Sequence, residues 1–380
     1  MSTTKIWLSS PHMSGNEMKY INEAFERNLV MPLGPNVTGL EDDIRRFTGS
    51  KGCSCLSSGT AALHLALINL GVEQGDEVIC STFTFSASAN PIVYQKAIPV
   101  FVDSEINTWN MDPGLLREAI DDRIKQTGKK PKAIILVHLY GMPAQLDEIM
   151  LIAASYDIPV IEDAAEAFGS TFKGKPCGTF GEIGILSFNG NKIITTSGGG
   201  ALISGNEDYC KNATFLATQA RDAAPHYQHS HIGYNYRMSN ISAGIGRGQM
   251  EVLEQRIAKR RENFLFYKEN LEKIEGVGVL TEPSADFFSN HWLTTILIDR
   301  VITGCVSRET LRVKLENHDI ETRPLWKPMH LQPVFRNYPS YTNGTSEFLF
   351  ENGLCLPSSS NITDEERQKV VAEVTRAVTK

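Results

Sequence analysis

Lys192 is the residue whose position first suggests chemistry. It lies in SFNGNKIITTSGGG, residues 187 to 200, between a glycine turn and a β-branched run that ends in three glycines. An amine in an apolar setting tends to lose its proton, and an unprotonated amine is a nucleophile that can condense with an aldehyde. Because a single lysine is more often a solvated surface residue, the case for Lys192 depends on its companions.

Two segments earlier in the chain could hold a phosphate and a flat ring. The small-residue turn from Ser57 to Thr60 directly precedes an apolar helical pattern, where free amides, hydroxyls and the helix dipole suit a phosphate. A simple helix cap would look the same. Phe83 and Phe85 follow a predicted strand, where one ring could stack on a planar cofactor or both could belong to the core.

Asp163 ends an apolar strand, with Glu162 before it and Glu166 three residues after it. A carboxylate at a buried strand end needs a cationic or donor partner, which a protonated ring nitrogen, a helix cap or a structural ion pair would each supply. A phosphate-binding turn, a ring for stacking, a strand-end acid and a reactive amine, in this order on a parallel sheet, are the parts needed to hold pyridoxal phosphate.

The elements that would position these residues follow a βαβ pattern. From about residue 50, short β-branched runs such as EVICSTFTF and IPVIEDAAEA alternate with helical stretches such as QLDEIMLIAASY. Asp112 and Pro113 suit the start of one of these helices. The pattern predicts a mostly parallel sheet with helices on both faces, and ligands bind such sheets at the carboxyl ends of the strands.

The length of 380 residues suggests two domains. We expect residues 1 to 255 to form the large sheet domain and residues 256 to 380 a smaller α+β domain. Ser14 and Glu17 predict a capping box at the start of an early helix. Residues 239 to 275 lack proline and keep helical spacing after their glycines, which predicts that a long helix leaves the large domain here.

Charge and hydropathy narrow the class of protein. The formal net charge of −7 and the lack of a basic run argue against nucleic acid or an anionic membrane as the main partner. We see no signal-peptide pattern at the start, and no apolar run approaches the roughly 20 residues that span a bilayer. A cytoplasmic protein without membrane insertion is therefore expected.

Cysteine and histidine spacing gives no sign of a disulfide frame or a metal centre. The seven cysteines are scattered and never spaced CxxC, which is typical of reduced, packed thiols. The HxxHxH spacing of His226, His229 and His231 has no fixed tetrahedral meaning without further ligands, so we predict no metal site.

From about residue 8 to its end, the chain resembles the DegT/DnrJ/EryC1/StrS family of pyridoxal-phosphate-dependent nucleotide-sugar aminotransferases. The resemblance is carried by several segments in order: PLGPNVTGLE, SSGTAALHLAL, TFTFSASAN, IEDAAEAFGSTFKGKPCGTFGEIGILSFNGNK, the glycines 198 to 200, GYNYRMSN and ETRPLWKPMH. It implies the fold-type-I, aspartate aminotransferase-like architecture. NGNKIITTSGGG, TQARD and RPLWKPMH are most similar to transaminases of the UDP-N-acetylbacillosamine pathway.

The resemblance assigns cofactor roles to particular residues. Lys192 matches the lysine that bonds the cofactor's aldehyde, and Asp163 matches the acid paired with the pyridine nitrogen. Glu166 occupies a position near the phenolic oxygen where relatives vary among Gln, His and Glu. The other expected cofactor-binding residues are Ser58, Gly59, Thr60, Phe85, Ser187, Asn189 and Asn235. Asn235 resembles an asparagine that reaches the phosphate from the other subunit, which implies a homodimer with shared active sites.

The family binds its sugar substrate with a turn, an arginine and a C-terminal loop. The expected substrate-binding residues here are Asn28, Leu29, Val30, Met31, Arg237, Arg323, Pro324, Leu325, Trp326, Lys327 and His330. Arginine and lysine suit a diphosphate, and a flat apolar side chain suits uridine. A structural salt bridge is the alternative for Arg237.

The resemblance implies transfer of an amino group from L-glutamate to C4 of a UDP-4-keto-6-deoxy-N-acetylhexosamine, with ping-pong kinetics. Three alternatives use the same fold: a transaminase for a dTDP- or GDP-linked or 3-keto sugar, a dehydratase, and a non-catalytic sensor of the cofactor or a sugar nucleotide. Dehydratases of the family replace the lysine with histidine, whereas Lys192 is present, and we find no appendage of the kind a sensor would carry. No GxGxxG follows the first strand, which argues against a plain NAD-binding fold.

Overall fold

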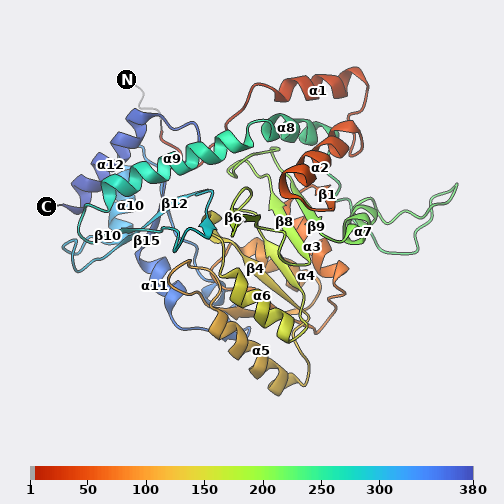
Figure 1. The fold of residues 1–380 in the computed structure, drawn as a ribbon, viewed down its shortest axis with the longest axis horizontal. Helices are drawn as coiled ribbons and strands as arrows, with labels where there is room; N and C mark the ends of the chain where they lie inside the picture. The colour runs from red at the N-terminus through yellow and green to blue at the C-terminus, as the bar shows by residue number, and fades with distance from the viewer. Residues whose placement is uncertain (1–4, 380) are drawn as a thin grey trace.

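A computed structural model describes residues 5–379 and shows two parts connected by a long helix (Figure 1). The larger part contains an eight-stranded sheet in the order β1-β9-β8-β5-β4-β2-β3-β14. Only β9 runs antiparallel to its neighbours, so the expected mostly parallel sheet is confirmed. The strands are β1 (Gly52–Leu56), β2 (Glu77–Ser81), β3 (Ile98–Val102), β4 (Ala133–Val137), β5 (Val160–Asp163), β8 (Ile183–Ser187), β9 (Gly200–Ser204) and β14 (Ser340–Tyr341).

Both faces of this sheet are buried under helices. Along β2, Val78 and Cys80 pack into the core beneath α3 (Gly59–Asn69) and α7 (Glu207–Ala217), while Ile79 packs into the core beneath α5 (Pro113–Thr127) and α6 (Leu146–Ser155). Successive strand residues point to opposite faces, so a strand covered on both sides has no polar alternation. This explains why the strands appear in the sequence as continuous apolar runs.

The start of α5 confirms one expected signal. The Asp112 carboxylate accepts hydrogen bonds from the amides of Gly114 (2.7 Å) and Leu115 (3.1 Å), and Pro113 occupies the first turn. Proline suits this position because its missing N–H would have no partner within the helix. The helix ends at Gly128, whose φ of 71° is left-handed.

The expected capping box of Ser14 and Glu17 is wrong, because Ser14 does not cap the helix. Helix α1 (Glu17–Glu26) begins at Glu17 itself, and its N-cap residue Asn16 makes no side-chain cap. The Glu17 carboxylate instead accepts from the amides of Ser14 (2.7 Å) and Gly15 (2.9 Å), and Gln249 donates a further hydrogen bond to it. The carboxylate therefore fixes the turn before the helix, because Glu17 is the first residue of the helix rather than its third.

The long helix expected within residues 239 to 275, after the glycines, is present, but a separate helix precedes it. The segment forms α8 (Asn240–Met250) and α9 (Leu253–Leu271), with a break at Glu251 and Val252. α8 packs closely on α1: a Cβ atom on Gly248 would lie 2.7 Å from the backbone nitrogen of Glu17. Because α8 is held against the larger part while α9 extends to the smaller one, the helix direction changes between them (Figure 1).

The smaller part is an antiparallel sheet packed on helices. Its strand order is β10-β12-β15-β13, and α9, α10 and α12 supply helical residues to its core, including Tyr267, Leu311 and Val370. The strands are β10 (Val277–Val279), β12 (Thr294–Ile298), β13 (Arg323–Pro324) and β15 (Gly353–Leu356), and the helices are α10 (Arg308–Glu316) and α12 (Asp364–Val378). Remaining elements are α2 (Pro35–Thr48), η1 (Ser86–Ser88), α4 (Asn90–Tyr94), η2 (Leu139–Gly141), β6 (Thr171–Phe172), β7 (Lys175–Pro176), β11 (Phe287–Phe288), η3 (Met329–Leu331) and α11 (Thr345–Asn352).

The chain crosses between the two parts more than once. Ile6 lies in the core of the smaller part and forms a β-bridge with Ile320. β14, from the C-terminal segment, extends the large sheet beside β3, and the Asp103 carboxylate after β3 accepts from the amides of Asn343 and Gly344, both at 3.1 Å. A domain boundary at residue 255 stays a prediction, because segments from each side of it contribute to the opposite part.

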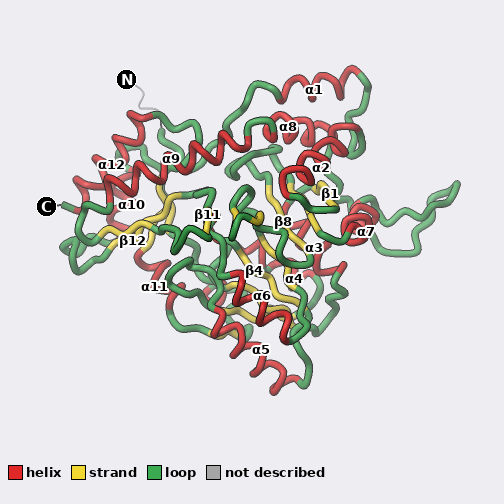
Figure 2. Tube along the Cα trace, viewed as in Figure 1, coloured by secondary structure: helices red, strands yellow, loops and turns green. Residues whose placement is uncertain are grey.

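The segment between α7 and α8 extends away from the rest of the molecule as an irregular arm (Figure 2). It carries the three histidines noted in the sequence, and the Tyr227 side chain is 80% exposed. Among residues 5–379 no group of three or more His, Cys, Asp or Glu side chains is arranged to hold a metal ion. None of the helices in this described range is both long and apolar enough to span a membrane.

Candidate active site

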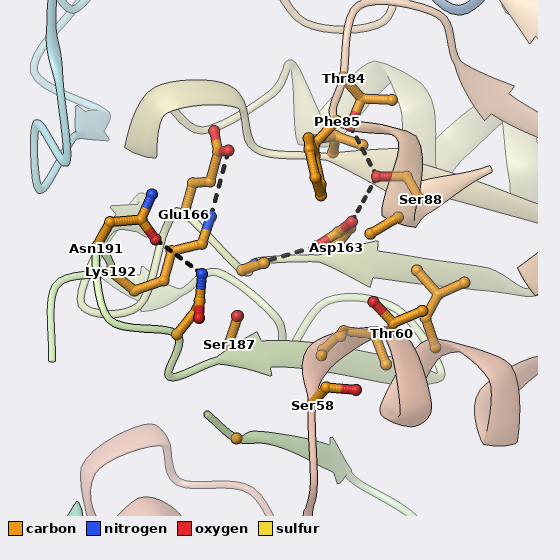
Figure 3. A pocket seen from close by; sticks show the side chains of 18 of the residues that line it. Ser58, Thr60, Thr84, Phe85, Ser88, Asp163, Glu166, Ser187, Asn191 and Lys192 are labelled. Atoms are coloured by element: carbon orange, nitrogen blue, oxygen red, sulfur yellow. Dashed lines mark hydrogen bonds and ion pairs between the residues drawn. The ribbon is translucent and has the colours of Figure 1, made fainter. Parts of the chain in front are cut away.

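A cavity of about 240 Å³ lies at the carboxyl ends of the parallel strands, between the larger part and two tryptophans, Trp292 and Trp326. Its walls come from the ends of β5 and β8, the start of α3, the turn after β2 and the loop after β8 (Figure 3). The cavity brings together these predicted site residues: Ser58, Gly59, Thr60, Phe85, Asp163, Glu166, Ser187, Asn189, Lys192 and Trp326.

The start of α3 forms one end of the cavity. The Ser58 hydroxyl accepts from the amide of Ala61 (3.0 Å), and the first backbone bond of the helix runs from the amide of Ala62 to the carbonyl of Ser58. The amides of Gly59 and Thr60 precede that bond, as first-turn amides do. A Cβ atom on Gly200 would lie 2.4 Å from the nitrogen of Gly59, so glycine there allows β9 to pass beneath this turn. Ser58 is thus a helix cap whose neighbouring amides face an anion site.

Asp163 lies at the end of β5 and is 8% exposed. One carboxylate oxygen accepts from the Ser88 hydroxyl (2.7 Å), which in turn shares a hydrogen bond with Thr84 (2.7 Å), and the other accepts from the amide of Ala165 (3.2 Å) (Figure 3). These partners are a hydroxyl and an amide rather than a cation. A buried carboxylate with this environment suits a positively charged ligand group in the cavity.

Lys192 points across the cavity toward Glu166 (Figure 3). The two charged atoms, Nζ of Lys192 and Oε1 of Glu166, lie 3.4 Å apart, and Nζ also lies 4.0 Å from the ring centroid of Trp292. The second Glu166 oxygen accepts from the amide of Tyr140 (2.7 Å). Burial raises the pKa of Glu166, and this effect outweighs the opposing effect of the Lys192 charge. The carboxyl group of Glu166 therefore ionises less readily than a solvent-exposed one, although it lies next to the amine.

The two phenylalanines have different environments. Phe83 is buried in a core cluster, whereas Phe85 is 52% exposed and lines the cavity. The Phe85 ring lies 5.2 Å from the Trp326 ring, which is also stacked on Tyr140 at 6.4 Å. Phe85 is the ring available to a planar ligand.

Several predicted residues lie outside this cavity. Arg323, Pro324 and Leu325 line a neighbouring cavity of about 500 Å³, which shares Asn191, Trp292 and Trp326 with the first. The other predicted residues, which line neither of these two cavities, are Asn28, Leu29, Val30, Met31, Asn235, Arg237, Lys327 and His330. Their assignments to cofactor or substrate stay predictions.

Arg237 forms a largely buried ion pair with Glu41 at 2.5 Å and donates to the carbonyl of Cys55 at 3.0 Å. Burial disfavours the charged guanidinium, but the carboxylate of Glu41 raises the pKa of Arg237 overall. His330 is engaged as well, with Thr82 at 2.7 Å and Glu347 at 3.1 Å. In a single chain, Arg237 therefore has the structural ion pair that the sequence left as an alternative.

Known proteins of one family are similar to this chain over most of its length. The model of the DegT/DnrJ/EryC1/StrS aminotransferase family matches residues 11–375. The chain is 51% identical to "Putative pyridoxal phosphate-dependent aminotransferase EpsN" of Bacillus subtilis (strain 168), with 97% of this chain and 94% of the relative covered. It is 37% identical to GDP-perosamine synthase of Escherichia coli O157:H7, with 94% of each chain covered. The crystal structure of a DegT DnrJ EryC1 StrS aminotransferase from Brucella abortus aligns with a TM-score of 0.89, 27% identity and 96% of each chain covered.

The chain belongs to the DegT/DnrJ/EryC1/StrS aminotransferase family. It has the fold of these enzymes, it is an aminotransferase, and its cofactor is pyridoxal 5′-phosphate. The set of side chains in the cavity fits the three reactive groups of this molecule. Lys192 suits its aldehyde, the amides and hydroxyls at the start of α3 suit its phosphate, and the carboxylate of Asp163 suits its protonated ring nitrogen.

Sequence reasoning about the aminotransferase missed Trp292, Ser88 and Asn191 as parts of the site. Trp292 lies beneath the Lys192 amine, Ser88 donates to Asp163, and the Asn191 carbonyl accepts from the indole N–H of Trp292 (2.7 Å). Ser88 lies inside TFTFSASAN, a segment that carries the family resemblance, so it could have been found there. Trp292 had no such signal, since it lies outside the segments that carry the resemblance and 100 residues further along the chain than Lys192.

Glu162, next to Asp163, has a structural role in the aminotransferase. Its buried carboxylate accepts from Nε2 of His138 (2.9 Å) and from the amides of Gly178 (2.9 Å), Phe180 (2.5 Å) and Gly181 (2.7 Å). Nδ1 of His138 accepts from the amide of Ala144, so Nε2 carries the proton. Burial opposes ionisation of Glu162, but the hydrogen bonds from His138 and the amides lower its pKa overall.

We expect Glu162→Ala to lower the free energy of unfolding of the cofactor-free protein by about 3 kcal/mol or more, because it leaves several buried donors without an acceptor. The midpoint of urea unfolding measures this. Glu182→Ala, which removes an exposed carboxylate close to the same turn, should change the free energy by less than about 0.5 kcal/mol. Equal midpoints for the Glu162 variant and the unchanged protein would contradict the role given to this carboxylate.

Proposed function

We propose that the enzyme transfers an amino group from L-glutamate to C4 of a UDP-4-keto-6-deoxy-N-acetylhexosamine, giving UDP-4-amino-4,6-dideoxy-GlcNAc and 2-oxoglutarate. The observation that carries this proposal is the pair of cavities on either side of Trp326. The inner one contains Lys192, and the adjoining one is lined by Arg323. A substrate with a reactive ketone at one end and a diphosphate at the other would occupy both.

The chain's own residues supply positioning and proton transfer. Bound pyridoxal phosphate would supply an electron sink for the carbanion formed next to the amino group. Lys192 would hold the cofactor through its aldehyde, and its amine would move a proton to and from the substrate carbon. Asp163 would keep the ring nitrogen protonated, and the carboxyl group of Glu166 lies 3.4 Å from the amine. The same side chains act in both halves of the exchange, first on glutamate and then on the ketosugar.

A panel of nucleotide ketosugars tests the substrate. Enzyme converted to its amine form with glutamate should be discharged fastest by UDP-4-keto-6-deoxy-GlcNAc, with mass spectrometry of the product and NMR couplings at C4 identifying the amine. GDP-4-keto-6-deoxymannose is the second candidate, because a relative at 37% identity is named GDP-perosamine synthase. Faster discharge by the GDP-linked sugar, or by a 3-keto or dTDP-linked sugar, would replace the UDP assignment while leaving the aminotransferase intact.

We propose further that the enzyme works as a homodimer with shared active sites. Asn235 and the turn from Asn28 to Met31 do not line the cavity of their own chain, and the exposed fractions of Val30 and Met31 are 52% and 41%. The arm between α7 and α8 extends outward (Figure 2), and Asn235, near its end, pairs through its backbone with Thr218 directly after α7. Residues arranged in this way would complete the site of a second copy of the chain.

Mixed dimers test the sharing of sites. We expect Lys192→Ala and Asn235→Asp, each nearly inactive alone, to regain about one quarter of the normal activity when the two proteins are denatured together and refolded, because half of the dimers are mixed and each holds one intact site. If Asn235 served the site of its own chain, no mixed dimer would hold an intact site. Absence of recovery, with dimers confirmed by light scattering, would contradict the shared arrangement.

A further inference from the structure

Arg260 is a buried arginine of α9 that has no carboxylate partner among the described residues. Its side chain is 1% exposed, and its guanidinium donates to the backbone carbonyl of Trp292, to the Ser9 hydroxyl (3.0 Å) and to the backbone carbonyl of Lys192 (3.5 Å). Burial, together with the nearby charge of Arg256, lowers the pKa of Arg260 to about 9. The side chain is therefore still charged at pH 7.

A buried charge without a counterion is costly, and an apolar side chain of similar volume often replaces one at no loss of stability. Arg260 also leaves its Nε atom without a partner. Stability alone therefore does not explain the presence of an arginine at this position. The three groups that Arg260 binds point to a different role.

These three groups all belong to the residues that hold the backbone and side chain of Lys192 in place. The carbonyl of Asn191, one residue before Lys192, accepts from the Ser9 hydroxyl (2.6 Å) and the Trp292 indole (2.7 Å). The carbonyl of Lys192 accepts from Arg260. Donors from the N-terminal segment, from Trp292 and from α9 thus fix two consecutive carbonyls at the base of the Lys192 side chain.

Arg260 also fixes the ring that lies beneath the amine. It binds the carbonyl of Trp292, while the amide of Trp292 donates to Asn290 (2.8 Å) and the Asn290 side chain donates to the carbonyl of Glu166 (3.0 Å). With both backbone groups of Trp292 engaged, its indole is held 4.0 Å from Nζ of Lys192. One guanidinium therefore contacts both the backbone of the lysine and the backbone of the residue that limits where its amine can lie.

We propose that Arg260 is a positioning residue that sets the direction of the Lys192 side chain by binding the carbonyls of Lys192 and Trp292. It acts through Lys192 and contacts neither cofactor nor substrate. Because α9 extends from the larger part to the smaller one (Figure 1), the lysine is aligned by the helix that connects them. The inference rests on the assignment of Lys192 to the cofactor, and that assignment is tested first.

The first step is to treat the pyridoxal phosphate form of the unchanged protein with borohydride and map the modified peptide. An adduct on Lys192 is expected. An adduct elsewhere would overturn the assignment of the lysine and, with it, this inference, whatever the Arg260 variants do.

The second step compares Arg260→Met, Arg260→Lys and the control Arg256→Met. Arg256 lies one turn earlier on α9, is 9% exposed and binds the carbonyls of His12 and Met13 (both 3.2 Å) rather than those of Lys192 and Trp292. For Arg260→Met we expect kcat to fall about 100-fold, with the KM for glutamate within about threefold, because misplacement of a reacting group by about 1 Å has effects of this size. When pyridoxal phosphate is added to cofactor-free protein, the borohydride-trapped adduct on Lys192 should form about tenfold more slowly.

Arg260→Lys, which keeps the charge but can reach fewer carbonyls, should give intermediate values, and Arg256→Met should leave both rates unchanged. If Arg260→Met lowered the thermal midpoint but left kcat and the rate of adduct formation as they were, the inference would be wrong. If Arg260→Met failed to fold, Arg260→Lys alone decides the question. Unchanged rates in Arg260→Lys would then overturn the inference, and slowed adduct formation would support it.

Discussion

Replacing Lys192 with alanine is expected to reduce transamination by at least about 10⁴-fold, because the variant loses both the covalent anchor of the cofactor and the group that moves the proton. The amine lies in the cavity beside Glu166 and above Trp292, and no second lysine lines that cavity within residues 5–379. Measured with glutamate and a nucleotide ketosugar, single turnovers should disappear together with the visible absorbance of the bound cofactor.

A lysine outside the site provides the control for this experiment. Lys173, which is exposed and paired with Asp147 on the surface, should tolerate replacement by alanine with activity unchanged. Full activity of the Lys192 variant would exclude this amine as the anchor. Partial activity that returned on addition of a small primary amine would instead agree with a lost proton carrier.

Replacing Asp163 with asparagine is expected to lower kcat by about 10³-fold. The amide keeps the shape of the side chain and its hydrogen bond with Ser88, but it carries no negative charge to hold the ring nitrogen in its protonated form. Ser88→Ala removes only a neutral hydrogen bond to that carboxylate, so its loss should be about tenfold or less. Comparing the kcat values of the two variants at saturating glutamate separates two roles of Asp163: its negative charge and the orientation that Ser88 gives to its carboxylate.

A modified cofactor tests the same point independently of the mutation. Pyridoxal phosphate methylated on the ring nitrogen carries a permanent positive charge, so it should restore part of the activity of Asp163→Asn. It should bring no gain to Ser88→Ala, in which the carboxylate is intact. Equal activity of the asparagine variant with either form of the cofactor would remove Asp163 from its assigned role.

Much of the large sheet could be predicted from local patterns. Strands such as β3 and β4 are buried on both faces, so they appear as uninterrupted apolar runs, and Asp112 with Pro113 marks the start of α5 by short-range chemistry alone. The break between α8 and α9 could not be predicted in this way. α8 packs through Gly248 on Glu17, a residue far away in the sequence, and local spacing does not show such a contact.

The residues of the candidate site also fall into those that local patterns predict and those that depend on long-range packing. Asp163, Ser187 and Lys192 belong to strand ends or the loop that follows, where a parallel sheet gathers its ligands, and the cavity contains all three. Ser9, Arg260 and Trp292 have no such marker, because each reaches the Lys192 loop from a segment that only the packing of the two parts brings near. Arg237 has a side-chain type that suits a diphosphate. In the single chain, however, its guanidinium is already paired with the carboxylate of Glu41.

The position of β14 at the edge of the large sheet has a consequence for synthesis on the ribosome. Strand β3 has β2 on one side, and its other side pairs only with Ser340 and Tyr341, which are translated some 240 residues after it. A nascent chain that already contains most of the enzyme therefore still has one free strand edge, of the kind that pairs with other chains. Protection of this edge is completed only when Ser340 and Tyr341 emerge, so translation products that stop before them should be the aggregation-prone species.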